Sequence, residues 1–154
     1  MIFVRERSDT EHLSSYLTKA GYSVAALHGS KTQEQREKAL NQLRGGKINI
    51  LVCTNVAARG IDVEDVALVV NYHAPANIVD YIHRIGRTGR AGKKGLAITF
   101  LSNADEALLF DLRKFLQEND QPVPNELANH PAARFRTGEA LLSKTVPTST
   151  SKHH

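Results

Sequence analysis

A basic segment from Tyr81 to Arg90, Y-I-H-R-I-G-R-T-G-R, carries the densest group of chemically useful side chains in the chain. Residues 81–94 contain no acidic residue. Their cations are Arg84, Arg87, Arg90, Lys93 and Lys94. Glycines at 86, 89 and 92 remove side-chain bulk, so the backbone and the guanidinium groups can approach a bound anion closely. Most short basic runs are solvated loops, but this spacing favours a polyphosphate site.

A helix is expected to position these arginines. Ile78, Tyr81, Ile82 and Ile85 recur at i, i+3, i+4 and i+7, which predicts a helix that buries this face. Arg87 and Arg90 would then follow its C-terminal end at a fixed place.

Two further segments carry groups that suit phosphates. Residues 54–62, T-N-V-A-A-R-G-I-D, follow an apolar run, so Thr54 and the next N–H groups could hold a phosphate and Asp62 could accept from a sugar hydroxyl. The alternative is a plain turn, since Thr, Gly and Asp are common turn residues. In residues 27–36, Gln33 and Arg36 begin a helix after Gly29, where a capped helix with a surface arginine is the alternative.

The segment from His83 to Arg90, H-R-I-G-R-T-G-R, resembles letter for letter the last conserved motif of the DEAD-box ATP-dependent RNA helicases. Residues 53–62 are similar to that family's A-T-D-V-A-A-R-G-L-D, with Cys53, Asn55 and Ile61 as the departures. Asn55 stands where the family has a charged Asp, which leaves the role of that position open.

The resemblance implies roles for individual residues. Arg87 and Arg90 would act as arginine fingers on the γ-phosphate of ATP, as in other phosphoryl-transfer enzymes, and His83 and Arg84 would couple two domains. The residues implied to face the nucleotide are Arg59, Gly60, Asp62, Arg87 and Arg90. The residues implied to contact the RNA backbone are Gly29, Gln33, Arg36 and Thr54.

The motifs that bind and hydrolyse ATP do not occur in the sequence. It contains neither G-x-x-x-x-G-K-[ST] nor D-E-A-D. The chain alone is therefore expected to be inactive, as the second of two RecA-like domains in an ATP-dependent RNA helicase. By this resemblance ATP with Mg²⁺ is bound mainly by the absent N-terminal RecA-like domain, and this chain supplies no metal ligands.

Strand and helix patterns alternate along the chain. Strands are expected at residues 2–4, 22–27, 48–54, 67–72 and 96–101, and their near-continuous apolar runs are typical of a parallel sheet. Capping boxes at Ser8 and Thr32 predict helix starts, and Leu108 begins the pattern of a closing helix. The predicted fold is an open α/β sandwich, a RecA-like parallel sheet with helices on both faces.

The pattern lapses after Asn119, which divides the chain into a helicase C-terminal domain at 1–118 and an extended, partly disordered tail at 119–154. Whether His153 and His154 are native stays open. Residues 124–131, P-N-E-L-A-N-H-P, and residues 29–37 resemble the DEAD-box helicase branch of pre-mRNA splicing. That resemblance implies a nuclear protein that remodels RNA duplexes together with spliceosomal particle proteins.

Composition sets the remaining expectations. The 154 residues are 41% hydrophobic with a net charge of +4, which fits one soluble domain with an anionic partner. A lone Cys53, no apolar run of membrane-spanning length and no secretory signal predict an intracellular, monomeric chain without membrane contact. A nucleotide-independent RNA-binding α/β module is the second hypothesis, and it gives no role to Arg87 and Arg90.

Overall fold

The structure is a computed structural model that describes residues 1–63 and 65–136. These residues form two compact units. The first unit holds residues 1–75 and 79–101, and the second holds residues 76–78 and those from Ser102 onward. No helix in the described part of the chain is long and apolar enough to cross a membrane.

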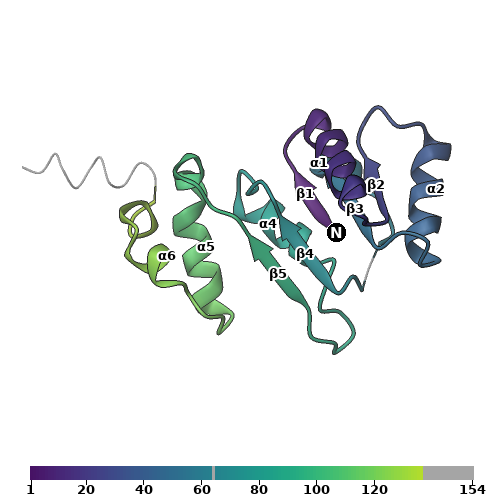
Figure 1. The fold of residues 1–154 in the computed structure, drawn as a ribbon. Helices are drawn as coiled ribbons and strands as arrows, with labels where there is room; N and C mark the ends of the chain where they lie inside the picture. Colours follow the sequence, from purple (N-terminus) through teal and green to yellow (C-terminus); the bar gives the residue numbers. More distant parts are fainter. Residues whose placement is uncertain (64, 137–154) are drawn as a thin grey trace, which may run out of the picture. The chain divides into compact units, whose positions relative to one another are not determined.

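The first unit is built on a five-stranded parallel sheet with the order β2-β3-β1-β4-β5 (Figure 1). The strands are β1 Ile2–Val4, β2 Val24–Leu27, β3 Ile50–Thr54, β4 Leu68–Asn71 and β5 Leu96–Thr99. Thr54 pairs with Val4, and Cys53 pairs with Leu27, so β1, β2 and β3 end at the same edge. The loops that carry the predicted RNA residues therefore begin side by side.

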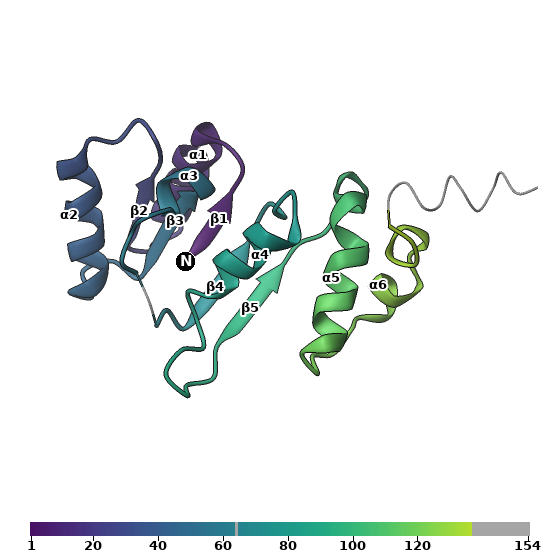
Figure 2. The same cartoon turned by 180° about the vertical axis from the view of Figure 1, so that it is seen from behind.

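Helices cover both faces of this sheet, which confirms the predicted RecA-like architecture. They are α1 Arg7–Lys19, α2 Gln33–Arg44, α3 Asn55–Ala58 and α4 Ile78–Ile85. Figures 1 and 2 show α1 on one side of the sheet and α3 and α4 on the other. Phe3, Leu51 and Cys53 of the sheet join Leu40 of α2 and Ala57 of α3 in one buried cluster. This buried cluster fixes the strands β1 and β3, from which the loops of the candidate site begin.

The two predicted helix starts have different outcomes. Thr32 caps α2 as predicted, with its hydroxyl accepting from Gln35 N–H at 3.2 Å. The start predicted at Ser8 is wrong, because α1 begins at Arg7 with Glu6 as its N-cap, and Glu6 N–H donates to Asp9 at 2.9 Å. A carboxylate replaces the expected hydroxyl and also suits the positive end of the helix dipole.

The second unit contains η1 Asn103–Asp105, α5 Glu106–Glu118, α6 Asn125–Asn129 and η2 Pro131–Ala133. Residues 125–133 thus form two short helical elements inside the segment that the sequence predicts as an extended tail. Leu127 and Ala133 are buried, and Arg113 of α5 donates to the Ala133 carbonyl at 3.3 Å. Hydrogen bonding and apolar contact with α5 therefore order this part. His153 and His154 lie outside the described residues.

Candidate nucleotide and RNA site

A pocket of about 430 Å³ brings most of the predicted catalytic and nucleotide-facing residues together. The members of that set that line it are Arg59, Gly60, His83, Arg84, Arg87 and Arg90. They come from the turn after α3, from α4 and from the loop after α4. Four guanidinium groups around one cavity suit a ligand with several negative charges.

Arg84 is the buried centre of this arrangement, with only 4% of its surface exposed. Its Nε donates to Asn55 Oδ1 at 2.6 Å, and its Nη1 donates to Asn71 Oδ1 at 3.1 Å and to the His73 carbonyl at 2.7 Å. The guanidinium also lies 5.0 Å from the centre of the Phe3 ring. Arg84 therefore ties α4 to the ends of β1, β3 and β4.

The acceptors of Arg84 are all neutral groups. Burial without a carboxylate in hydrogen-bond contact lowers the pKa of this guanidinium to about 10. The structure thereby gives a place to Asn55, the departure from the family motif, as a direct acceptor from Arg84. An Asp in this position would place a carboxylate in direct hydrogen-bond contact with Arg84. The sequence analysis missed Asn71 as a member of this network. One signal could have indicated it, because Asn71 is a polar residue at the end of the apolar run 68–70, and in the structure it is fully buried.

Arg87 is held by main-chain carbonyls around the turn after α3. Its Nη1 donates to the Ile61 carbonyl at 2.8 Å and its Nη2 to the Ala58 carbonyl at 3.2 Å. The Arg87 carbonyl accepts from Val66 N–H at 3.1 Å, and the Thr88 hydroxyl donates to the Val66 carbonyl. The arginine loop is therefore fixed to the segment just before β4.

The other two arginines are more exposed. The Arg90 Nε donates to the Gly86 carbonyl, and Arg59 Nη2 lies 3.8 Å from Asp80 Oδ1. The Arg59 side chain is 71% exposed and the ion pair is long, so Arg59 gains little stability from it. Both side chains thus lie at the solvent-exposed side of the pocket.

Asp62 is the one predicted nucleotide-facing residue that does not line this pocket. Its side chain is 88% exposed and lies 3.7 Å from Arg44, which also donates to the Asp62 carbonyl. A role for Asp62 toward a sugar hydroxyl stays a prediction.

The predicted RNA residues lie at the edge where the strands end. Gly29 follows β2, Thr54 is the last residue of β3, and Gln33 and Arg36 lie in the first turn of α2. Thr54 caps α3, since its hydroxyl accepts from Ala57 N–H at 3.5 Å. Thr54 therefore has the structural role of a helix cap in the turn from β3 to α3. A contact of Thr54 with RNA stays a prediction. Arg5 and Arg7 follow β1 at this edge and add charge that no motif had indicated.

Gly29 differs from the other loop glycines because the fold does not need it to be glycine. A Cβ added there would meet no atom within 4 Å, and its φ is not positive. The space beside its main chain is therefore open to a ligand.

Gly95 was overlooked in the sequence and fixes the arginine loop. A Cβ at Gly95 would lie 2.3 Å from Gly89 N and 2.6 Å from Thr88 Oγ1, far inside contact distance. Gly89 itself has a φ of +68°, which an L side chain rarely adopts. The absence of bulk at these glycines thus serves the packing of the loop between Arg87 and Arg90.

In the two-domain helicase that the sequence resemblance implies, we expect Gly95→Ala to displace the Thr88–Gly89 backbone and to lower ATP hydrolysis about 10-fold or more, because misplacing a catalytic group by ~1 Å costs up to ~100-fold. Steady-state ATPase kinetics measures the effect. Gly29→Ala is the matched control, since its Cβ enters open space; it should leave kcat at saturating RNA unchanged. Normal kcat in Gly95→Ala would show that the loop tolerates the shift.

Comparisons with known proteins identify the family of the chain. The helicase conserved C-terminal domain family matches residues 1–92. The probable ATP-dependent RNA helicase DDX23 of Homo sapiens is 51% identical over 145 residues, which are 94% of this chain and 18% of that protein. The pre-mRNA-splicing ATP-dependent RNA helicase PRP28 of Chaetomium globosum is 50% identical over 137 residues, 88% of this chain and 19% of that protein. The chain spans about a fifth of the length of these relatives.

Solved structures give the same relationship. The RNA helicase Prp28 from Chaetomium thermophilum bound to ADP is 50% identical with a TM-score of 0.77, over 84% of this chain and 32% of that chain. The yeast DEAD-box splicing factor Prp28 is 40% identical with a TM-score of 0.78, over 86% of this chain and 30% of that chain. The family match, these relatives and the parallel sheet together show that the chain belongs to the helicase conserved C-terminal domain family, as a RecA-like domain of the DEAD-box type.

Proposed function

We propose that this chain is the half of an ATP-dependent RNA helicase that supplies arginine fingers and RNA-backbone contacts. One observation carries the proposal: the pocket lined by Arg59, Arg87 and Arg90 adjoins the edge that carries the RNA residues. Thr54 lies on that edge, and the next residue, Asn55, lines the pocket and bonds to Arg84. The two sites are thus adjacent along the main chain.

The donor set of the pocket fits a polyphosphate. Arg59, Arg87 and Arg90 present planar guanidinium groups that can bond two phosphate oxygens each. The one carboxylate in the pocket lining, Asp80, lies beside Arg59. Within residues 1–63 and 65–136, no three His, Cys, Asp or Glu side chains gather as a metal site. By the likeness to DEAD-box helicases, ATP with Mg²⁺ would be held mainly by the N-terminal RecA-like domain, and the arginines would stabilise charge that develops on the γ-phosphate.

The RNA contacts would be made mainly to phosphates. Arg5, Arg7 and Arg36 stand at the strand edge beside Gly29, whose main chain is open to a ligand. Such groups position a nucleic acid without reading its bases. By similarity to the splicing helicases, the parent protein would remodel RNA duplexes in the nucleus with spliceosomal particle proteins.

A nucleotide-independent RNA-binding module is the second candidate. The basic strand edge favours it as much as it favours a helicase. The pocket does not, because an RNA binder gives no role to Arg87 and Arg90 beside Arg59. RNA-stimulated ATP hydrolysis on addition of the N-terminal domain separates the two.

We expect this chain to bind single-stranded RNA weakly, without sequence preference and with an affinity that falls as salt rises, because counterion release dominates phosphate binding. Gly29→Ala should weaken binding while leaving thermal stability unchanged or slightly raised, since it only restricts the unfolded chain. Fluorescence anisotropy over a salt series and thermal denaturation measure both. Tight, salt-independent and sequence-selective binding would contradict the proposed RNA surface.

A further inference from the structure

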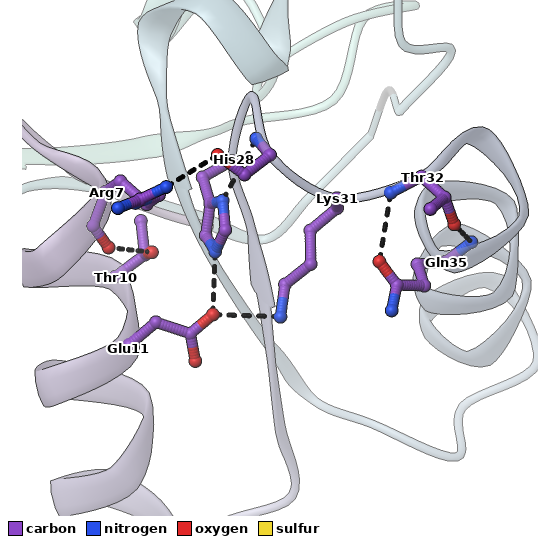
Figure 3. A network of polar contacts seen from close by, with 8 residues as sticks. Arg7, Thr10, Glu11, His28, Lys31, Thr32 and Gln35 are labelled. Atoms are coloured by element: carbon purple, nitrogen blue, oxygen red, sulfur yellow. Dashed lines mark hydrogen bonds and ion pairs between the residues drawn. The ribbon is translucent and has the colours of Figure 1, made fainter.

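A polar network ties helix α1 to the loop that follows β2 (Figure 3). Glu11 Oε1 lies 2.6 Å from His28 Nε2 and 2.8 Å from Lys31 Nζ. Arg7 Nη1 donates to Ser30 Oγ at 2.8 Å. Two residues of α1 therefore hold the loop 28–31 from outside it.

His28 is the buried member of this network, with 5% of its surface exposed. Its Nδ1 lies 3.3 Å from Ser30 N, and a main-chain N–H can only donate, so Nδ1 carries no proton. The neutral ring then holds its proton on Nε2 and donates it to Glu11. The two ring nitrogens thus connect a main-chain N–H of the loop to a carboxylate of α1.

Glu11 is suited to accept these bonds at neutral pH. Hydrogen bonds from Lys31 and His28 hold the pKa of its carboxyl below the usual range. The Glu11 side chain is nevertheless 51% exposed, so packing of the protein interior does not depend on it.

The position of this loop decides where the predicted RNA contacts lie. Gly29 stands between His28 and Ser30, and its carbonyl lies 3.4 Å from Arg36 Nη2. Thr32, directly after the loop, caps the helix that carries Gln33. A shift of the loop therefore moves the Gly29 main chain and the start of α2 together. Main-chain contacts to phosphate tolerate only about 0.5 Å of misplacement.

We propose that Glu11 and His28 are positioning residues for RNA binding, which hold the Gly29 loop so that its main chain and Arg36 meet the phosphate backbone. The inference rests on the proposed function, because it takes the Gly29 loop as an RNA contact. It assigns no contact with RNA to either residue.

The sign of the effect at Glu11 separates this role from simple electrostatics. A carboxylate near an RNA site repels phosphate, so charge alone predicts tighter RNA binding when Glu11 is replaced. Loss of positioning predicts weaker binding. Glu11→Gln and Glu11→Ala remove the same charge, but the amide oxygen of Gln still accepts from His28 Nε2–H.

The test measures KM for RNA and kcat at saturating RNA in the two-domain parent helicase. We expect Glu11→Ala and His28→Ala to raise KM about ten-fold with kcat within about two-fold, because they disturb binding and not the transition state. Glu11→Gln should stay within about three-fold of wild type. His12→Ala, at an exposed position of α1, is the matched control and should change neither quantity.

Two further variants, Arg36→Ala and Gly29→Ala, distinguish a wrong positioning role for Glu11 and His28 from a wrong assignment of the RNA surface. If both raise KM while Glu11→Ala leaves it unchanged or lowers it, the positioning role is wrong. If neither raises KM, the RNA surface itself is wrong and the inference falls with it. Equal effects of Glu11→Gln and Glu11→Ala would also overturn it, because the acceptor that Gln keeps for His28 would then make no difference to RNA binding. Should His28→Ala fail to fold, the two variants at the half-exposed Glu11 still decide the matter.

Discussion

Replacing Arg87 or Arg90 by Ala in the two-domain parent helicase lowers kcat for ATP by roughly 10³ or more, because an arginine finger stabilises charge that is present only in the transition state. RNA binding should change far less, since loss of one phosphate contact costs only about 1 kcal/mol. Arg87→Lys should not restore the rate, because an ammonium lacks the planar fork that spans two phosphate oxygens. ATPase kinetics at saturating RNA and RNA titration are measured on each variant.

The two arginines differ in the contacts that their loss disturbs. Arg87 also donates to the Ile61 and Ala58 carbonyls, so its loss disturbs the turn after α3. Arg90 is exposed and donates to the Gly86 carbonyl within its own loop, so the two variants disturb different parts of the site. Lys94→Ala removes an exposed cation of the same basic segment and should leave kcat unchanged. If RNA affinity collapses while kcat stays near wild type, both arginines are RNA ligands and the finger assignment fails.

The sheet could be predicted because the residues within each strand carry a local apolar pattern that indicates a strand. Runs such as Leu51–Cys53 are apolar at every position, as a doubly covered strand requires, and the loops after them then share one edge. The motif residues of the pocket could be predicted for the same reason, since a short segment fixes their order and spacing.

The contacts inside the site depend on residues far apart in the sequence, and so local patterns did not give them. The helical spacing places Ile82 on the buried side of α4, yet Ile82 is 41% exposed and Arg84 lies inward next to Tyr81. An arginine takes that place because three acceptors from outside α4 converge on it: Asn55 of α3, Asn71 of β4 and the His73 carbonyl after β4. The spacing of residues within α4 gives no information about those acceptors, so the burial of Arg84 could not be predicted from it. Gly95 was missed similarly, because its neighbour Gly89 lies across a turn.

Arg84→Met should lower the free energy of unfolding by about 3 kcal/mol or more, because it leaves the Asn55 and Asn71 oxygens and the His73 carbonyl without their donor, and each unsatisfied buried group costs ~1–3 kcal/mol. Met fills much of the volume, so the loss reports mainly on the hydrogen bonds. Arg59→Met is the matched control, because Arg59 is 71% exposed with one ion pair of 3.8 Å, and it should change stability by less than about 0.5 kcal/mol. Chemical denaturation measures both variants.

Asn55→Asp should act in the opposite direction and raise stability by about 1 kcal/mol, because it replaces a neutral acceptor of the buried Arg84 guanidinium with a carboxylate and so turns the hydrogen bond into an ion pair. Arg84 would lower the pKa of the new carboxyl, so the gain is present above the unfolded value of about 3.9 and is lost as pH falls through the folded value. In an Arg84→Met background the same change should give no gain, since the cation that the carboxylate needs is gone. A gain that persists without Arg84, or that does not depend on pH, would mean that Asn55 does not act through this guanidinium.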